Sequence, residues 1–166
     1  MKKISKYVFP MVAGLFTVAT LNSCNDKAAQ KNETTTNTEF NLETAKAEIE
    51  EANKNFMELF AKGDSVGLAN AYTVDGKVMM ASAPSVVGRE KIQTAWHSMI
   101  SSGLTKAVLK TENIYGTEEL LAEEGVATLF VKNETVGVEK YIVLWKKEDG
   151  KWKLFRDIFN SNLPVK

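Results

Sequence analysis

Apolar residues after position 41 recur at steps of three and four, which is the spacing of one face of a helix. The first such run extends from Leu42 to Phe60, and the side chain of Asn41 is suited to cap its start. Lys62 and Gly63 follow the run and are typical of a helix end. The pattern therefore predicts one long amphipathic helix at the start of the folded region.

Two further helices and a strand are predicted next. Asp64 is suited to cap a short helix that continues to Tyr72. The segment Thr73–Ala81 has the composition of a strand, and Pro84 breaks the chain after it. Gly88 precedes a third helix, whose apolar face would carry Ile92, Ala95, Trp96, Met99 and Ile100.

The pattern after residue 103 changes to strands. Four are predicted, over Ala107–Tyr115, Gly125–Lys132, Val136–Lys147 and Lys151–Asn160. The Asp149-Gly150 pair between the last two is a strong signal for a hairpin turn. Helices followed by a run of antiparallel strands indicate an α+β domain rather than alternating βαβ units.

The first 39 residues have a different pattern. A lysine-bearing start, MKKISK, precedes 15 uncharged residues and then LNSC, which is the order of a secretory signal. The tetrad Leu21–Cys24 resembles a bacterial lipobox, and this resemblance implies cleavage before Cys24 and lipidation of its thiol. A plain signal peptide followed by an incidental cysteine is the alternative. We therefore expect a signal peptide over 1–23, a lipidated cysteine with a flexible tether over 24–39, and a folded domain over 40–166. The expected location is the bacterial cell envelope, with a lipid anchor in a membrane.

Charge and cysteine content narrow the classes of partner. The chain has 21 basic and 21 acidic residues, so no electrostatic argument favours nucleic acid. One cysteine cannot form an internal disulfide, and one histidine argues against a zinc site. We expect neither a metal nor a cofactor.

Three segments resemble a known family: GDSVGLANAYTVDGKVM, VVGREKIQTAW and KYIVLWKKEDGKWKLFRDIFNSNLP. They are similar to the SnoaL-like domain of the nuclear transport factor 2-like superfamily, in particular the branch named domain of unknown function 4440. The resemblance covers Phe40–Pro164. It implies a cystatin-like cone, in which N-terminal helices pack on a curved antiparallel sheet of four to six strands and enclose a conical pocket. It also implies a possible homodimer through the outer face of the sheet.

Asp157 is the first candidate for chemistry. Strand alternation places it on one face with Phe155 and Phe159, and it places Arg156 on the other face, so Arg156 is not its direct partner. If the face of Asp157 lines the pocket, desolvation would raise the pKa of this carboxyl and suit it to acid–base work. The alternative is a buried structural carboxylate that binds an arginine, a tryptophan or a backbone donor.

Five other residues carry weaker signals. His97 lies at the flank of its helix's apolar face and is either a surface residue or a base at the pocket rim; Tyr72 is the other candidate partner of Asp157 in catalysis. Arg89 either binds a carboxylate at the pocket mouth or pairs with an acid such as Asp157. Asn160 either binds a ligand or caps its strand. Ketosteroid isomerase belongs to the wider fold and has its base near the end of the first strand, where Met80 stands here and cannot take a proton.

The expected pocket residues are Phe56, Phe60, Tyr72, Met80, Arg89, Trp96, Met99, Asp157 and Asn160. Such a pocket suits a small apolar or amphipathic ligand. The leading hypothesis is a membrane-anchored lipoprotein that binds such a ligand without chemistry. An enzyme of isomerase, cyclase or hydrolase type that uses Asp157 as its acid or base is an alternative, and a protein-interaction module is another.

Overall fold

The structure is a computed structural model, and it describes residues 39–162. The predicted signal peptide, Cys24 and most of the predicted tether lie outside the described residues. The described residues form three helices, α1 (Leu42–Ala61), α2 (Ser65–Asn70) and α3 (Arg89–Ser101). Within residues 39–162, no helix is long and apolar enough to cross a membrane.

The helix ends follow the predicted capping residues. The Asn41 side chain accepts a hydrogen bond from the backbone N–H of Thr44, and the Asp64 side chain accepts one from that of Gly67. The predicted end of α2 at Tyr72 is wrong, because α2 ends at Asn70 and Tyr72 begins the first strand. This shift places the Tyr72 side chain in the sheet.

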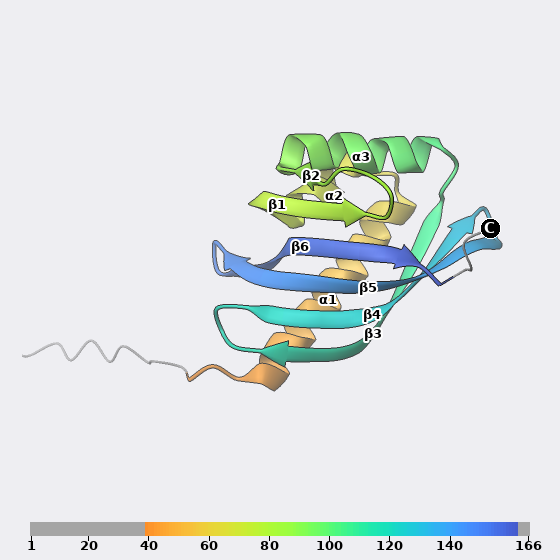
Figure 1. Cartoon of the computed structure of the whole chain (residues 1–166). Coiled ribbons are helices and arrows are strands. Elements are labelled where there is room, and N and C mark those ends of the chain that lie inside the picture. The colour runs from red at the N-terminus through yellow and green to blue at the C-terminus, as the bar shows by residue number, and fades with distance from the viewer. Residues whose placement is uncertain (1–38, 163–166) are drawn as a thin grey trace, which may run out of the picture. The chain divides into compact units, whose positions relative to one another are not determined.

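Six strands form one curved sheet, which confirms the α+β class and the cystatin-like arrangement (Figure 1). They are β1 (Tyr72–Met80), β2 (Val86–Val87), β3 (Lys106–Gly116), β4 (Leu121–Val131), β5 (Glu134–Glu148) and β6 (Lys151–Ser161), in the order β2-β1-β6-β5-β4-β3. The other neighbouring strands are antiparallel, but β1 and β6 run parallel. The sheet is thus mixed, not wholly antiparallel as predicted, and β2 was not predicted.

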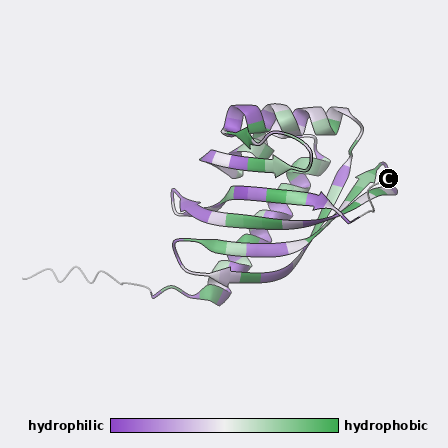
Figure 2. Cartoon of the chain, viewed as in Figure 1, coloured by the Kyte–Doolittle hydropathy of each residue, from purple (hydrophilic) through white to green (hydrophobic). Residues whose placement is uncertain are grey.

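The helices cover one face of this sheet. α1 crosses behind β3 to β6, and α3 lies beside β1 and β2 (Figure 1). Hydrophobic and hydrophilic residues mix along the strands (Figure 2), because one side of each strand packs against the helices. In β4 every second residue from Leu121 to Ala127 is buried. The buried face includes the fully enclosed rings of Phe60, Tyr72 and Trp145.

The outer face of the sheet carries exposed apolar residues. Ile142 of β5 and Ile158 of β6 pair directly and are 45% and 41% exposed. An apolar pair at the centre of an open sheet face is suited to contact with a second sheet. The homodimer implied by the family resemblance stays a prediction, which sedimentation velocity would measure.

β6 contains a β-bulge at Phe155. Its neighbours Leu154 and Arg156 pair with adjacent residues of β5, so Phe155 has no residue opposite it. The extra residue reverses the alternation, and Leu154 comes to line the same cavity as Asp157. The prediction that Phe155 shares the face of Asp157 is therefore wrong. The Phe155 ring instead contacts the cationic groups of Lys146 and Arg156.

Candidate functional site

A small cavity of about 60 Å³ lies between α1, α3 and the sheet. Its lining residues are Asn53, Phe56, Phe60, Trp96, Met99, Ala107, Leu109, Ala127, Leu129, Glu139, Tyr141, Val143, Leu154, Asp157 and Phe159. Trp96 is the centre of its aromatic wall. Phe56 and Phe60 contact Trp96 edge to face, with ring centroids 5.5 and 5.9 Å away, and Phe159 stacks on it at 6.4 Å.

Asp157 places a carboxyl group in this wall. The residue is 6% exposed, and the Tyr72 hydroxyl donates a hydrogen bond of 2.6 Å to its Oδ2. Tyr72 reaches it because β1 lies parallel beside β6. Within residues 39–162, no donor binds the other oxygen, Oδ1. Asp157 thus has one bonded oxygen and one that remains available.

Burial raises the pKa of Asp157 to about 7. The hydrogen bond from Tyr72 acts in the opposite direction, and the negative charges of Glu123 and Glu139 add to the rise. Burial also raises the pKa of Tyr72, and the charge of Asp157 raises it further. At neutral pH Asp157 can therefore both give and accept a proton, while Tyr72 stays a hydrogen-bond donor.

Trp96 brings a third polar group to this end of the cavity. Its indole Nε1–H is buried and makes no hydrogen bond of ordinary geometry. It is still close enough to the Tyr72 hydroxyl to lower the pKa of that group, against the larger effect of burial. The aromatic wall therefore contains a buried indole N–H near the Tyr72 hydroxyl, which itself donates to Asp157.

Glu139 of β5 brings a second carboxyl group to the cavity wall, and sequence analysis missed it. The residue is half-buried, and burial raises its pKa above the ordinary value. The alternation of Glu139, Tyr141 and Val143 toward one face of the strand was the signal that could have found it.

Glu123 of β4 is a third buried carboxyl group, directly behind the cavity wall. It is 0% exposed and accepts four hydrogen bonds within residues 39–162. The donors are Asn53 Nδ2 at 2.7 Å, Thr111 Oγ1 at 2.7 Å, Tyr141 hydroxyl at 2.8 Å and Trp145 Nε1 at 2.9 Å. Burial raises the pKa of Tyr141, and the charge of Glu123 raises it further. Glu123 is therefore a satisfied structural carboxyl group that joins α1, β3, β4 and β5.

The structure brings some of the predicted pocket residues together and separates others. Phe56, Phe60, Trp96, Met99 and Asp157 line the cavity, while Tyr72 lies behind Asp157. Met80, Arg89 and Asn160 do not line it, so their predicted place in the pocket is wrong. His97 is exposed on α3, with its Nε2 3.5 Å from the Ser101 hydroxyl, and it does not line the cavity.

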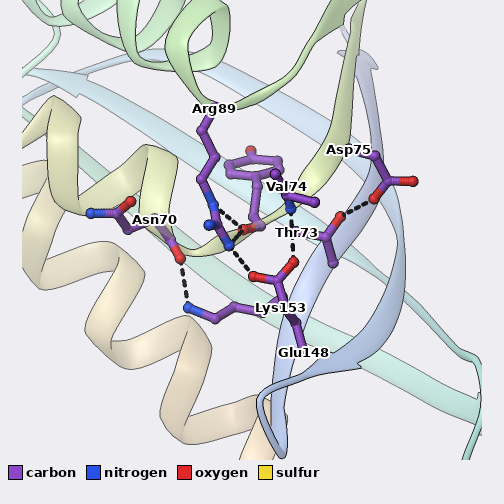
Figure 3. Close-up of polar contacts among 8 residues, drawn as sticks. Asn70, Thr73, Val74, Asp75, Arg89, Glu148 and Lys153 are labelled. Atoms are coloured by element: carbon purple, nitrogen blue, oxygen red, sulfur yellow. Dashed lines mark hydrogen bonds and ion pairs between the residues drawn. The ribbon is translucent and has the colours of Figure 1, made fainter.

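Arg89 belongs to a separate polar cluster that joins α3 to the sheet (Figure 3). Its guanidinium donates to the backbone carbonyl of Tyr72 and to the carboxylate of Glu148, which in turn accepts a hydrogen bond from the Val74 N–H. Arg89 therefore pairs with an acid, as one of its two predicted alternatives has it, but that acid is Glu148 and not Asp157. The Val74 hydrogen bond lowers the pKa of Glu148, and the ion pair with Arg89 adds to this effect. These contacts indicate a structural role for Arg89.

The cavity is acidic as well as apolar. Among residues 39–162, its lining includes Asp157 and Glu139 but no lysine, arginine or histidine. Among the described residues, no group of three or more histidine, cysteine, aspartate or glutamate side chains is arranged to hold a metal ion.

Comparison with solved structures identifies the fold. A protein of unknown function from Mycobacterium tuberculosis is similar with a TM-score of 0.66 and 13% identity, over 75% of each chain. A protein from Novosphingobium aromaticivorans described as nuclear transport factor 2-like with a cystatin-like fold has a TM-score of 0.64 and 15% identity, over 73% of this chain and 84% of that one. A ketosteroid isomerase-like protein from Erwinia carotovora atroseptica has a TM-score of 0.56 and 20% identity, over 71% of this chain and 96% of that one.

No protein-family model matches the chain, and no curated protein sequence matches it. Each of these three structures is at most 20% identical to this chain, so the similarity establishes the fold, and the function has to be inferred from the site. The chain thus has the cystatin-like fold of nuclear transport factor 2-like proteins.

Proposed function

We propose that this protein binds a small apolar or amphipathic molecule in the cavity between α1, α3 and the sheet. The observation that carries the proposal is the available Oδ1 of buried Asp157 within an otherwise apolar, aromatic wall. Apolar cavities with a few placed polar groups are the usual form of small-molecule sites, because burial supplies affinity and the polar groups fix orientation.

The size of the cavity limits the ligand. Its volume of about 60 Å³ is smaller than the ~150 Å³ of an engineered apolar cavity that holds benzene. The apolar lining residues that are only half-buried are the ones that can move to enlarge it, namely Met99, Leu109, Leu129 and Phe159. The ligand is therefore a molecule of few heavy atoms, or a larger one that displaces some of these four side chains.

The variant Ala127→Leu is expected to abolish ligand-induced stabilisation, because Ala127 lines the cavity and the added methyl groups would fill it. A ligand at a hundred times its Kd should stabilise the wild-type protein by about 2.7 kcal/mol. The measurement is thermal unfolding against a library of small aromatic and aliphatic compounds. Ala122→Leu is the matched control, because Ala122 is on the same strand but is not a lining residue. Equal stabilisation of wild type and Ala127→Leu would contradict the proposed site.

Acid–base catalysis at the same place is a second candidate function. The hydrogen-bonded Tyr72–Asp157 pair and the pKa of about 7 for Asp157 favour it, since a base near the working pH transfers protons efficiently. Solvent deuterium appearing at the acidic carbon of a bound carbonyl compound, and not in Asp157→Asn, would support catalysis. Binding without any such exchange would leave the binding function alone.

We propose further that the protein is held to a membrane in the cell envelope through a lipid on Cys24. The support is the order of a lysine-bearing start, an uncharged apolar run and the lipobox-like tetrad. Cys24→Ser is expected to remove incorporation of a labelled fatty acid and to release the protein from the membrane fraction. Ser23→Ala keeps a small residue before the cysteine and should keep the label. Labelled Cys24→Ser protein would contradict the anchor.

A further inference from the structure

Among the described residues, no basic side chain in the cavity lining balances the negative charges of its carboxyl groups. Two carboxyl groups, those of Asp157 and Glu139, line it, and Glu123 lies just behind its wall. In the part of the chain that the structure describes, no basic side chain belongs to the lining, although the whole chain has 21 lysine and arginine residues. Burying a carboxylate without a basic partner costs free energy. Two carboxyl groups in the wall of an apolar cavity therefore indicate that something outside the lining compensates their charge.

The three carboxyl groups differ in how well the fold satisfies them. Glu123 accepts four hydrogen bonds, whereas Asp157 accepts one, and Glu139 accepts none within residues 39–162. The carboxyl group behind the wall is thus complete without a ligand. The two that line the cavity are the two with oxygen atoms still available. Their unused capacity to accept hydrogen bonds therefore lies where a ligand would bind.

We propose that the ligand is a small organic cation, such as an amine with an apolar body, whose positive charge binds at the available oxygen of Asp157, with Glu139 on the same cavity wall adding to the negative potential. This inference rests on the proposed binding function and names its ligand class. An ammonium group supplies N–H donors and the charge that the lining lacks, which offsets the cost of burying the carboxylates. A neutral ligand would leave that cost in place, and a carboxylate ligand would add to it.

The aromatic wall supports the same ligand class. Trp96 lies among Phe56, Phe60 and Phe159, and the Tyr141 ring also lines the cavity. The faces of such rings attract cations, tryptophan most strongly, and the attraction increases when water is excluded. The rings can hold the apolar body of an amine while also stabilising its charge.

Cation binding is linked to the protonation of Asp157. The titratable groups that face this carboxyl are Tyr72 from β1, Glu123 from β4, and Glu139 and Tyr141 from β5, while α1 and α3 contribute no titratable side chain to the cavity lining. Glu123 and Glu139 favour the protonated form of Asp157, and a bound cation would favour the ionised form. Below neutral pH, binding of a permanent charge therefore releases a proton, and affinity should rise about tenfold per pH unit.

The test compares three probes of similar size on purified full-length protein by calorimetry: benzylamine, benzyl alcohol and benzoate, with butylamine, butanol and butyrate as a smaller set. We expect the amine of a set to bind at least tenfold more tightly than the alcohol at pH 7.5, and the carboxylate not to bind. Amine affinity should fall about tenfold between pH 6.5 and 5.5, and alcohol affinity should not change.

Variants separate a charge effect from a change of shape. Glu139→Gln and Asp157→Asn should each weaken amine binding about tenfold and leave alcohol binding within twofold. Glu134→Gln, an exposed residue on the same strand that does not line the cavity, should change neither. Equal affinity for amine and alcohol would overturn the cation inference and keep the binding function. Failure of every probe in both sets to bind would overturn both.

Discussion

Asp157→Asn is expected to stabilise the protein at pH 8 by about 4 kcal/mol and to make its stability less dependent on pH. The pKa of this carboxyl is raised from its ordinary value of 3.8 to about 7 in the folded protein, mainly by burial. Because the folded pKa lies above the unfolded one, the contribution of Asp157 to stability is fully present below about pH 4 and is lost as the pH rises through 7. Three pKa units correspond to roughly 4 kcal/mol, as an order of magnitude.

The substitution to asparagine removes the titration and keeps the shape. The amide oxygen can still accept the hydrogen bond from the Tyr72 hydroxyl, so the contact at 2.6 Å is retained. Urea unfolding of wild type and variant at pH 5 and pH 8 measures the effect as the difference between the two proteins. The contributions of the other carboxyl groups are the same in both proteins and cancel in that difference. Glu148 is one of them, and its lowered pKa makes the protein more stable as the pH rises.

Asp75→Asn is the control for this experiment, because Asp75 is exposed and its carboxylate accepts a hydrogen bond from the Thr73 hydroxyl. It should shift stability by less than about 0.5 kcal/mol at either pH. An Asp157→Asn variant with the same pH dependence as wild type would show that Asp157 is not a buried titrating group.

The local elements of this fold follow from local rules in the sequence. Asn41 and Asp64 cap their helices as predicted, and Asp149 and Gly150 both have positive φ at the hairpin turn, 53° and 74°. The parallel pairing of β1 with β6 joins segments about 80 residues apart in the chain, and no local pattern specifies it. The bulge at Phe155 likewise depends on pairing with β5, so strict alternation failed at that residue.

The same distinction applies to the site. Phe56, Phe60, Trp96 and Met99 were predicted to line the pocket because helical spacing fixes which side chains face the sheet. Arg89 was wrongly placed there because its partners are a backbone carbonyl and Glu148, which only the folded chain brings near. The carboxyl groups of Glu123 and Glu139 were missed because acidic residues in strands are expected to face water. Their positions nevertheless fall on the same face of their strands as buried neighbours.

Glu123→Gln is expected to destabilise the protein by about 2–4 kcal/mol, although it removes a buried charge and changes almost no volume. A carboxylate accepts at both oxygens, whereas an amide has one oxygen and one donor group. In one orientation the new –NH2 faces the indole N–H of Trp145, which cannot turn away. In the other it replaces the Oε1 that accepts from Asn53, Thr111 and Tyr141. Either orientation leaves a buried donor without an acceptor, at about 1–3 kcal/mol for each group.

Glu124→Gln is the matched control, since it is the same change one residue along the same strand. Glu124 accepts one hydrogen bond from the Asn113 amide, at 2.7 Å on the exposed side of the sheet. An amide oxygen and water can replace that contact, so the control should cost less than about 0.5 kcal/mol in urea unfolding at pH 7.

Loss of the Glu123 charge should also lower the pKa of Asp157, because that charge helps to raise it. Glu123→Gln therefore separates two effects of one residue: lower stability from the unpaired donors, and an Asp157 titration shifted to lower pH, visible by carboxyl NMR. If Glu123→Gln is as stable as Glu124→Gln, the four hydrogen bonds to Glu123 do not stabilise the fold, and this expectation is wrong. An Asp157 titration that does not move in the variant would show that the charge of Glu123 does not raise the pKa of Asp157.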